Sequence, residues 1–222
     1  MTARSDGTGA GEALVAAAGH LFVAGVMSHA GHANLSARID DGRFALTTTG
    51  IVRDLRPDQV ATVGLDGNVL GGELAPENAE IVAMHAVVYR ARPGVGGIIH
   101  THSPAATAFA LANRELPCRA EPLLRFGQAE PIPVVAWGPR GSEVSVRGIA
   151  AVLDERATTS AVLLANHGLL AFGPDPMAAA RLVVAVEEAA EAELAAQVIG
   201  GAVDFPSGAL DQVRESMARV RS

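Results

Sequence analysis

Apolar residues recur at helical spacing in three long stretches of the chain. In the first stretch, Leu14, Ala18, Leu21 and Phe22 fall on one side of an amphipathic helix. The same pattern predicts long helices over residues 12–26, 76–91 and 176–199, and shorter helices over residues 103–112, 141–154 and 210–220.

Shorter runs of β-branched and aliphatic residues predict strands between these helices. Asp66-Gly67-Asn68 separates two of the runs and tolerates positive φ, so it predicts a β-hairpin. Asn166-His167-Gly168 predicts a second tight turn between strands. The expected strands lie within residues 28–38, 43–46, 60–65, 69–70, 97–102, 132–136, 160–165 and 169–172.

Two serines predict helix starts. Ser103, followed by Pro104, is the expected N-cap of one helix, and Ser142 is the expected N-cap of another. Residues 1–11 are rich in Gly, Ser and Thr and predict a disordered N-terminal tail. We expect residues 12–222 to form a single domain.

Composition narrows the class of protein. Of the 222 residues, 49% are hydrophobic and 4% aromatic, which predicts a core of Ala, Val, Leu and Ile. The net charge of −7, without a run of Lys or Arg, argues against a nucleic-acid partner. The single cysteine, Cys118, excludes an internal disulfide. The sequence shows no signal peptide and no apolar run of membrane-spanning length, so we expect a cytoplasmic protein without a membrane partner.

The strand that ends in His100-Thr101-His102 carries the candidate chemistry. Residues two apart in a strand share a face, so both imidazoles can point at one divalent metal. Such a site needs a third ligand, and His167 in its tight turn is the candidate. The alternative is that His100 and His102 are unrelated surface histidines at a strand end.

Four motifs together resemble the class II aldolase/adducin-head superfamily, whose best-known enzymes resemble L-fuculose-1-phosphate aldolase. They span most of the chain and occur in the order and spacing of that superfamily, at residues 33–38, 46–51, 84–104 and 166–168.

The resemblance implies a three-layer α/β/α fold with a central, mostly antiparallel sheet, and a homotetramer. It also implies that His100, His102 and His167 bind a metal, most often Zn²⁺, with Fe²⁺, Mn²⁺ or Co²⁺ as alternatives. By the same resemblance, Asn34, Thr49, Gly50 and the position of Asn78 are substrate-binding.

The catalytic acid of the superfamily has a less regular counterpart here. Glu80 stands upstream of the histidines, one residue further from His85 than the aldolase pattern has it, and Glu77 is the reserve. We expect Glu80 to be the catalytic proton carrier. The alternative is that both are exposed acids at a helix start, where the helix dipole favours them.

Two further departures from the aldolase pattern concern phosphate binding and the proton donor. Asn78-Ala79 replaces a pair of hydroxyl residues that binds phosphate in the aldolases, which puts a phosphorylated substrate in doubt. The proton-donating tyrosine of the aldolases also has no counterpart after the histidines, because Tyr89 is the single tyrosine and lies before them. Polar residues that could replace it are Arg119, Glu121, Arg125 and Gln128.

Three other histidines have simpler interpretations. His85 falls on the apolar face of its helix, which favours a buried, hydrogen-bonded side chain. His29 and His32 precede Asn34, and we expect loop positions for them rather than substrate contacts.

The expected activity is that of a metal-dependent class II aldolase-type lyase acting on a small hydroxy-carbonyl compound, such as a sugar or sugar phosphate. Glu80 would move the proton while the metal stabilises an enediolate. An alternative keeps the site but makes the protein an Fe²⁺-dependent oxygenase, an epimerase or a dehydratase acting on a non-phosphorylated substrate. A non-enzymatic interaction module, as in adducin heads, is disfavoured because all three histidines are present.

Overall fold

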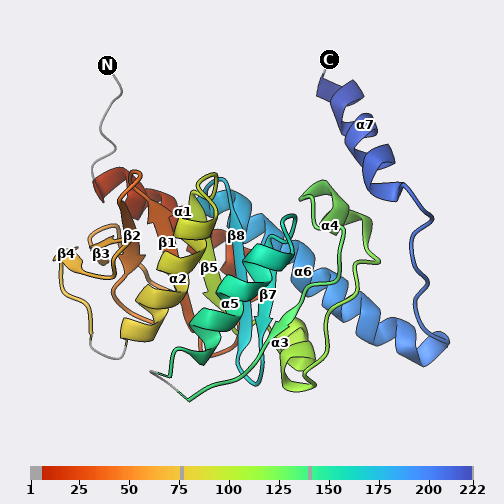
Figure 1. Ribbon diagram of the computed structural model, residues 1–222, viewed down its shortest axis with the longest axis horizontal. Helices are drawn as coiled ribbons and strands as arrows, with labels where there is room; N and C mark the ends of the chain where they lie inside the picture. The colour runs from red at the N-terminus through yellow and green to blue at the C-terminus, as the bar shows by residue number, and fades with distance from the viewer. Residues whose placement is uncertain (1–6, 76–77, 140–141, 222) are drawn as a thin grey trace.

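An eight-stranded sheet forms the centre of the protein in a computed structural model that describes residues 7–75, 78–139 and 142–221 (Figure 1). The strand order is β4-β3-β2-β1-β5-β8-β7-β6, and the neighbouring strands are antiparallel except for the parallel pair β6–β7. The strands are β1 Ala33–Arg38, β2 Arg43–Thr47, β3 Val60–Gly64, β4 Val69–Gly71, β5 Gly97–Thr101, β6 Val134–Val135, β7 Ala161–Leu164 and β8 Gly168–Gly173.

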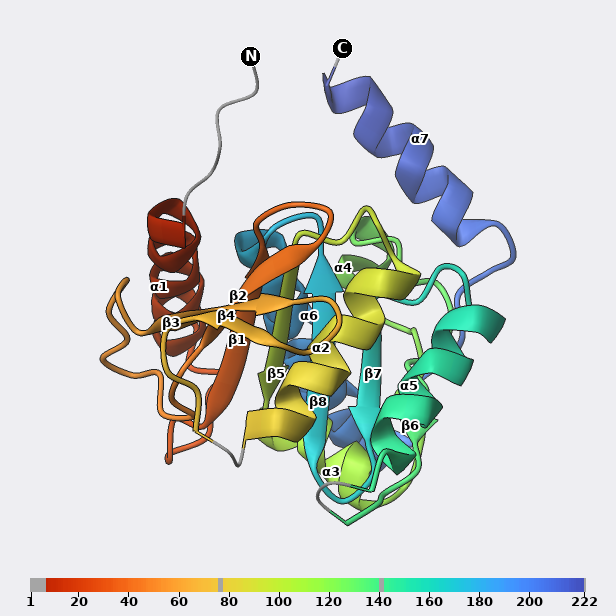
Figure 2. The ribbon, with the colours of Figure 1, turned by 60° about the vertical axis from the view of Figure 1, so that its left-hand side comes forward.

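Helices cover both faces of the sheet, which confirms the expected three-layer α/β/α fold. Helices α2 and α5 lie on one face, and α1, α3 and α6 lie on the other (Figure 2). The helices are α1 Gly7–Val23, α2 Ala79–Ala91, α3 Pro104–Leu111, α4 Glu121–Arg125, α5 Val144–Glu155, α6 Pro176–Ala196 with the short 3-10 helix Gln197–Ile199, and α7 Ala209–Arg221.

Strand alternation divides the core into two apolar layers. On β1, Leu35 belongs to the layer under α1 and α6, whereas its neighbours Asn34 and Ser36 face the layer under α2. On β5, Ile99 joins the first layer and Ile98 the second. The sheet therefore packs an apolar layer against the helices on each face, and the buried polar residues of β1 lie on the side of α2.

Several element boundaries differ from the expectations. Helix α1 begins at Gly7, so residues 7–11 are helical where we expected a tail, and residues 1–6 lie outside the described part of the chain. The N-cap position of α5 is Glu143, in a left-handed conformation at φ 55°, so Ser142 as N-cap was wrong. The five-residue helix α4 was not predicted, because one helical turn is too short to show a periodic pattern.

Helix α3 begins where predicted, although its capping differs. Ser103 occupies the N-cap position, but its Oγ lies 2.8 Å from Thr101 Oγ1 and makes no capping bond. The buried carboxylate of Glu187, from α6, accepts hydrogen bonds from the backbone N–H groups of Ala105 and Ala106 at 2.7 and 2.8 Å. A side chain that is distant in sequence therefore caps α3, the helix that follows β5.

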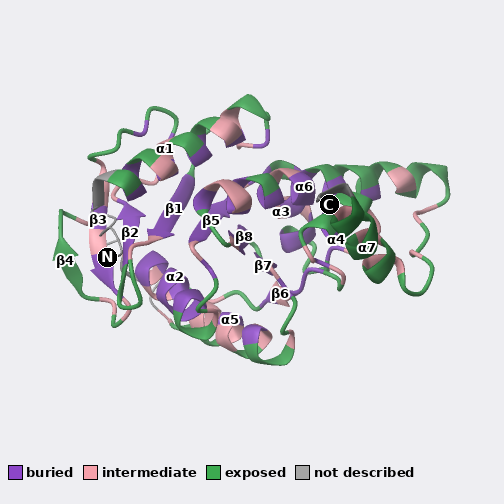
Figure 3. Cartoon of the chain, turned by 90° about the horizontal axis from the view of Figure 1, so that it is seen from above, coloured by how far each residue is buried: buried purple, intermediate pink, exposed green. Residues whose placement is uncertain are grey.

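The C-terminal helix stands away from the sheet. Figure 3 shows α7 mainly exposed, and it contacts the rest of the chain at α4. Among the helices that the structure describes, none has an apolar stretch that could cross a membrane.

Candidate metal centre

Three histidines converge at the end of β5. His100 lies on β5, His102 directly follows the strand, and His167 lies in the turn between β7 and β8. One nitrogen of each ring lies within 4.8 Å of the others. The ring centroids are 4.6 Å apart for His100 and His167, 5.0 Å for His102 and His167, and 5.1 Å for His100 and His102. The structure thus brings together all three predicted ligands.

The tight turn that carries His167 is shaped by its neighbours. Asn166 adopts φ 56°, a left-handed conformation that asparagine tolerates better than most residues. A Cβ at Gly168 would lie 2.4 Å from the Thr101 carbonyl oxygen and 3.0 Å from Cδ2 of His102. Only glycine lets this turn approach the end of β5 so closely. The motif Asn-His-Gly therefore places His167 beside the other two histidines for steric reasons.

His100 is oriented by the backbone. Its Nδ1 lies 3.0 Å from the Leu169 carbonyl oxygen, and it is 2% exposed. A carbonyl oxygen can only accept, so Nδ1 carries the proton and Nε2 keeps its lone pair. Histidine ligands of metals commonly donate their second nitrogen in this way.

The electrostatic environment keeps two of the rings neutral. Burial, followed by the proximity of His167 and His102, holds the pKa of His100 well below its usual value. Burial, followed by His167 and His32, lowers the pKa of His102 to about 4. Neutral imidazole is the form that binds metal, so these two rings suit a divalent cation such as Zn²⁺.

The expected substrate-binding residues lie on neighbouring elements. Asn34 on β1 pairs directly with His100 on β5 and is 8% exposed. Asn78 Nδ2 donates to the Thr48 carbonyl oxygen at 3.3 Å, and Ile51 N donates to Thr49 Oγ1 at 3.1 Å. The turn that contains Gly50 is thereby joined to the start of α2.

Glu80 is half-buried in the first turn of α2. It lines a cavity of about 200 Å³ together with Trp137, Asn166 and His167. The carboxylate and one candidate ligand thus face the same space, whereas Glu80 is not among the side chains whose ligand atoms cluster within 4.8 Å. Glu77, the reserve acid, lies outside the described residues.

His85 belongs to a buried polar network. Its Nδ1 lies 2.7 Å from Ser36 Oγ, which in turn lies 2.9 Å from the Tyr89 hydroxyl. Arg38 stacks over the Tyr89 ring at 4.7 Å. The expectation of a buried, hydrogen-bonded His85 is confirmed. Burial lowers the pKa of His85 to about 3 and raises the pKa of Tyr89.

His32 was expected to be a loop residue without substrate contact, but its ring reaches the metal centre. The ring centroid lies 6.0 Å from that of His102, and Nδ1 lies 2.6 Å from the Gly50 carbonyl oxygen. The sequence signal for this placement was its position two residues before Asn34, near the start of the strand that pairs with β5.

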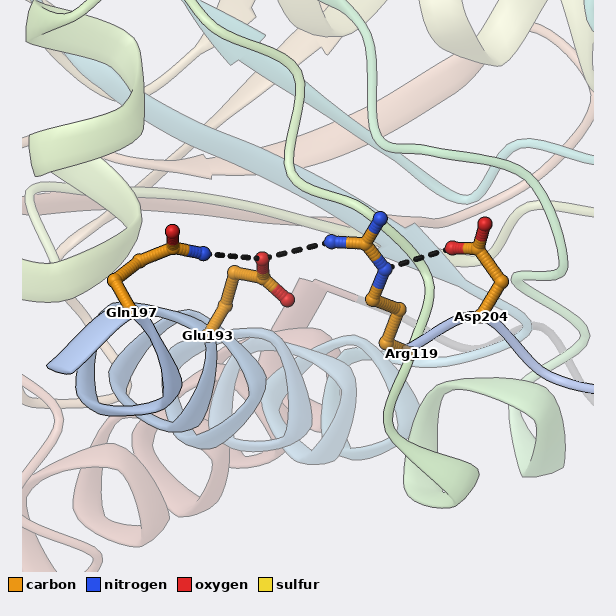
Figure 4. Close-up of polar contacts among 4 residues, drawn as sticks. All are labelled: Arg119, Glu193, Gln197 and Asp204. Carbon is orange, nitrogen blue, oxygen red and sulfur yellow. Dashed lines mark hydrogen bonds and ion pairs between the residues drawn. The ribbon is translucent and has the colours of Figure 1, made fainter. Parts of the chain in front are cut away.

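Arg119, one candidate replacement for the missing tyrosine, is held by acids of the C-terminal region (Figure 4). Its Nη1 lies 2.9 Å from Glu193 Oε1, and its Nε lies 2.7 Å from Asp204 Oδ1. Gln197 also donates to Glu193, at 3.2 Å. Arg119 therefore joins the chain after α6 to the segment that precedes α4.

The other three candidates also have partners outside the metal centre. Arg125 and Glu121 form an ion pair at 2.6 Å within α4. Gln128 is fully buried, accepts from Ser160 N at 2.8 Å and donates to the Glu130 carbonyl oxygen at 2.7 Å. The buried contacts of Gln128 indicate a structural role, whereas the pair of Arg125 and Glu121 is an exposed contact within one helix.

The fold and the three histidines describe an α/β/α protein with a candidate divalent-metal site at the end of a central strand. The chain matches the Class II Aldolase and Adducin N-terminal domain over residues 13–194 and belongs to this family, as the sequence motifs indicated.

Named relatives of the chain are enzymes. It is 34% identical over 170 residues to a 3-oxo-tetronate 4-phosphate decarboxylase of Haemophilus influenzae, covering 72% of this chain and 76% of that protein. It is 31% identical over 159 residues to a 5-methylthioribulose-1-phosphate/5-deoxyribulose-1-phosphate aldolase of Rhodospirillum rubrum, covering 71% of this chain and 68% of that protein. Among solved structures, an L-fuculose 1-phosphate aldolase superposes with a TM-score of 0.81 at 24% identity, covering 95% of this chain and 96% of that one.

Proposed function

We propose that the protein is a metal-dependent class II aldolase-type lyase that releases an aldehyde from a small hydroxy-carbonyl substrate. The observation that carries this proposal is the convergence of His100, His102 and His167 beside a cavity that also contains Glu80. Family membership supports it, because the named relatives act on hydroxy-carbonyl compounds.

The three imidazoles would hold the cofactor, for which Zn²⁺ is our first choice. A bound divalent metal would supply Lewis acidity at the substrate carbonyl and stabilise the negative charge that develops there. Glu80 would accept the proton of the substrate hydroxyl as the carbon–carbon bond breaks and return it to carbon in the other fragment. The end of the substrate that carries phosphate in the aldolases would be positioned by Asn34, Thr49, Gly50 and Asn78.

The substrate end is a specific point of divergence from the aldolases. Residues 78 and 79 are asparagine and alanine, so neither supplies a hydroxyl group for phosphate. In addition, the Thr48 carbonyl oxygen already accepts one amide hydrogen of Asn78. This observation favours a second candidate, in which the same metal centre acts as an epimerase, a dehydratase or an Fe²⁺-dependent oxygenase on a non-phosphorylated substrate.

Metal analysis and product analysis separate the two candidates. Protein purified without added metal should contain zinc and release aldehyde from one of the compounds named for its relatives, or from its non-phosphorylated form. The compounds whose aldol cleavage gives an aldehyde are 5-methylthioribulose 1-phosphate, 5-deoxyribulose 1-phosphate and L-fuculose phosphate, whereas 3-oxo-tetronate 4-phosphate would lose carbon dioxide and so tests for a decarboxylase. Iron content with consumption of oxygen would favour the oxygenase instead, and loss of water without aldehyde would favour the dehydratase.

Glu80→Gln tests the proton carrier. The variant should keep its metal and lose turnover by about 10²- to 10⁴-fold, because the amide cannot accept the proton. Glu73→Gln, an exposed acid just before α2, is the matched control and should leave turnover unchanged. Turnover of Glu80→Gln near that of the wild type would remove Glu80 from the mechanism.

We also propose a homotetramer. In the isolated chain, the segment after α6 exposes Val198 and Ile199 at 87% each and Val203 at 83%, and an interface between subunits would bury this apolar surface. Light scattering after size-exclusion chromatography should give four times the chain mass, and a monomer at micromolar concentration would contradict the proposal.

A further inference from the structure

His32 lies against the turn where the substrate is expected. The residue is exposed and forms a β-bridge with Ile51 just before β1 begins. Its Nδ1 is 2.6 Å from the Gly50 carbonyl oxygen. Two contacts therefore hold His32 against the Thr49–Gly50 turn. One is the backbone bridge to Ile51, and the other is the contact of the ring with the Gly50 carbonyl oxygen.

The ring occupies the space that a side chain at position 50 would need. A Cβ at Gly50 would lie 2.7 Å from Cε1 and 2.8 Å from Nδ1 of His32. A side chain at position 50 would displace the His32 ring, which packs directly over the α-carbon of Gly50. Residues 32 and 50 form one unit of the pocket wall.

The same ring also faces the metal centre. Its centroid is 6.0 Å from that of His102, with the planes at 58°. His32 does not join the three histidines whose ligand nitrogens lie within 4.8 Å of one another, so it stands beside the ligand set. A substrate chelated by the metal would pass the His32 ring on its way from the three histidines to the Gly50 turn.

The hydrogen bond to Gly50 determines what His32 can offer a substrate. A carbonyl oxygen accepts only, so Nδ1 carries the ring proton and Nε2 of the neutral ring holds a lone pair. Nε2 is therefore a hydrogen-bond acceptor, which suits a hydroxyl group and does not suit a phosphate oxygen.

We propose that His32 is a further substrate-contacting residue, whose Nε2 accepts a hydrogen bond from a substrate hydroxyl next to the metal-chelated carbonyl. This inference rests on the proposed function, since it takes a metal-chelated hydroxy-carbonyl compound as the substrate. It assigns to His32 part of the recognition that the hydroxyl pair provides in the aldolases, with a preference for a hydroxyl group.

Two small chelators test the proposal without turnover. Acetohydroxamate and glycolohydroxamate chelate zinc through the same two oxygens, and they differ in one hydroxyl group beyond the chelate. Titration calorimetry on the zinc-loaded full-length protein at pH 8, where imidazole is neutral, measures both affinities. The wild type should bind glycolohydroxamate about five- to tenfold more tightly than acetohydroxamate, as expected for one hydrogen bond.

His32→Asn is the decisive variant, because its amide can still donate to the Gly50 carbonyl while the acceptor at the Nε2 position is lost. It should abolish the preference for glycolohydroxamate, leave acetohydroxamate affinity unchanged and keep the zinc content. His29→Asn, an exposed histidine of the same loop, is the matched control and should retain the full preference.

Each other result overturns the inference in a distinguishable way. Loss of zinc from His32→Asn would make His32 a metal ligand. Equal weakening of both hydroxamates would make it a general support of the pocket, and an unchanged preference would remove it from recognition. Failure of both hydroxamates to bind the zinc-loaded wild type would overturn the proposed metal centre itself, and His32 with it.

Discussion

The two faces of the central strands differ in chemistry although they share the same backbone. On β1, Leu35 packs into the apolar layer under α1 and α6, whereas Asn34 and Ser36 face α2. On β5, Ile99 points to the first face, and His100 shares the second with Asn34. Both faces carry an apolar layer, but at β1 and β5 the second face also places the buried polar residues Asn34, Ser36 and His100 beside the candidate metal centre.

The difference shows how one strand pair can serve stability and chemistry at once. The first face stabilises the fold by removing aliphatic surface from water, and each large side chain contributes roughly 1.5–3 kcal/mol. Buried polar groups on the second face need internal partners, and Ser36 contacts both His85 Nδ1 and the Tyr89 hydroxyl, whereas Nε2 of His85 is buried without a partner among the described residues. Neighbouring residues of β1 should therefore respond differently to substitution.

Leu35→Ala should have the largest effect on stability. Leu35 is fully buried, and truncation should cost about 2–5 kcal/mol in the free energy of unfolding because it leaves a cavity. Urea denaturation of metal-free protein measures this cost, and zinc affinity of the folded variant should stay within about twofold of the wild type. Leu194→Ala, a leucine that is 45% exposed, is the control and should cost less than about 1 kcal/mol. A small cost at Leu35 would contradict the structural role of the first face.

His85 should make stability depend on pH. Its pKa is about 3 in the folded chain and near 6.5 when unfolded, so between these values the unfolded chain binds one more proton. Stability should therefore fall as the pH drops below about 6.5, by about 1–2 kcal/mol between pH 7 and pH 5.

His85→Asn removes this proton-binding group while leaving an amide near Ser36. The difference in unfolding free energy between wild type and variant should shrink as the pH falls from 7 to 5, in metal-free protein. His29→Asn, changed in parallel, serves as the control. Parallel pH curves for wild type and His85→Asn would show that His85 does not titrate on unfolding.

Asn34→Ala should give the smallest change in stability. Asn34 is adjacent to Leu35 on β1 but lies on the opposite face of the sheet, so the two variants compare the two faces directly. We expect less than about 1 kcal/mol in unfolding free energy, and about a tenfold rise in KM, because a substrate hydrogen bond is lost. Urea denaturation and steady-state kinetics on the best substrate measure the two effects. An unchanged KM would take Asn34 out of the binding site.

Much of the fold followed from local pattern. The hairpin around Gly67, the turn around His167 and the long helix α6 lie where periodicity and turn residues predicted them. The His-x-His spacing and the motifs around it also predicted which three histidines converge. These predictions were correct because strand alternation, helical spacing and positive φ are properties of short stretches of chain.

Contacts between distant segments were not predictable in the same way. Glu187 caps α3 from 81 and 82 positions away, and Ser36 joins His85 across 49 positions. The start of α1 and the cap of α5 were also misjudged, because tertiary packing overrides weak local signals at helix ends.

The sequence by itself determined the class of fold, the cluster of His100, His102 and His167, and the membership of the class II aldolase family, because each depends on local spacing and residue type. Only the tertiary structure decided that Glu80 shares a cavity with His167 and that His32 lies over Gly50. These pairings depend on how α2 and the turn before β1 pack against the sheet. Packing of that kind is set by the whole core, and no short stretch of chain encodes it.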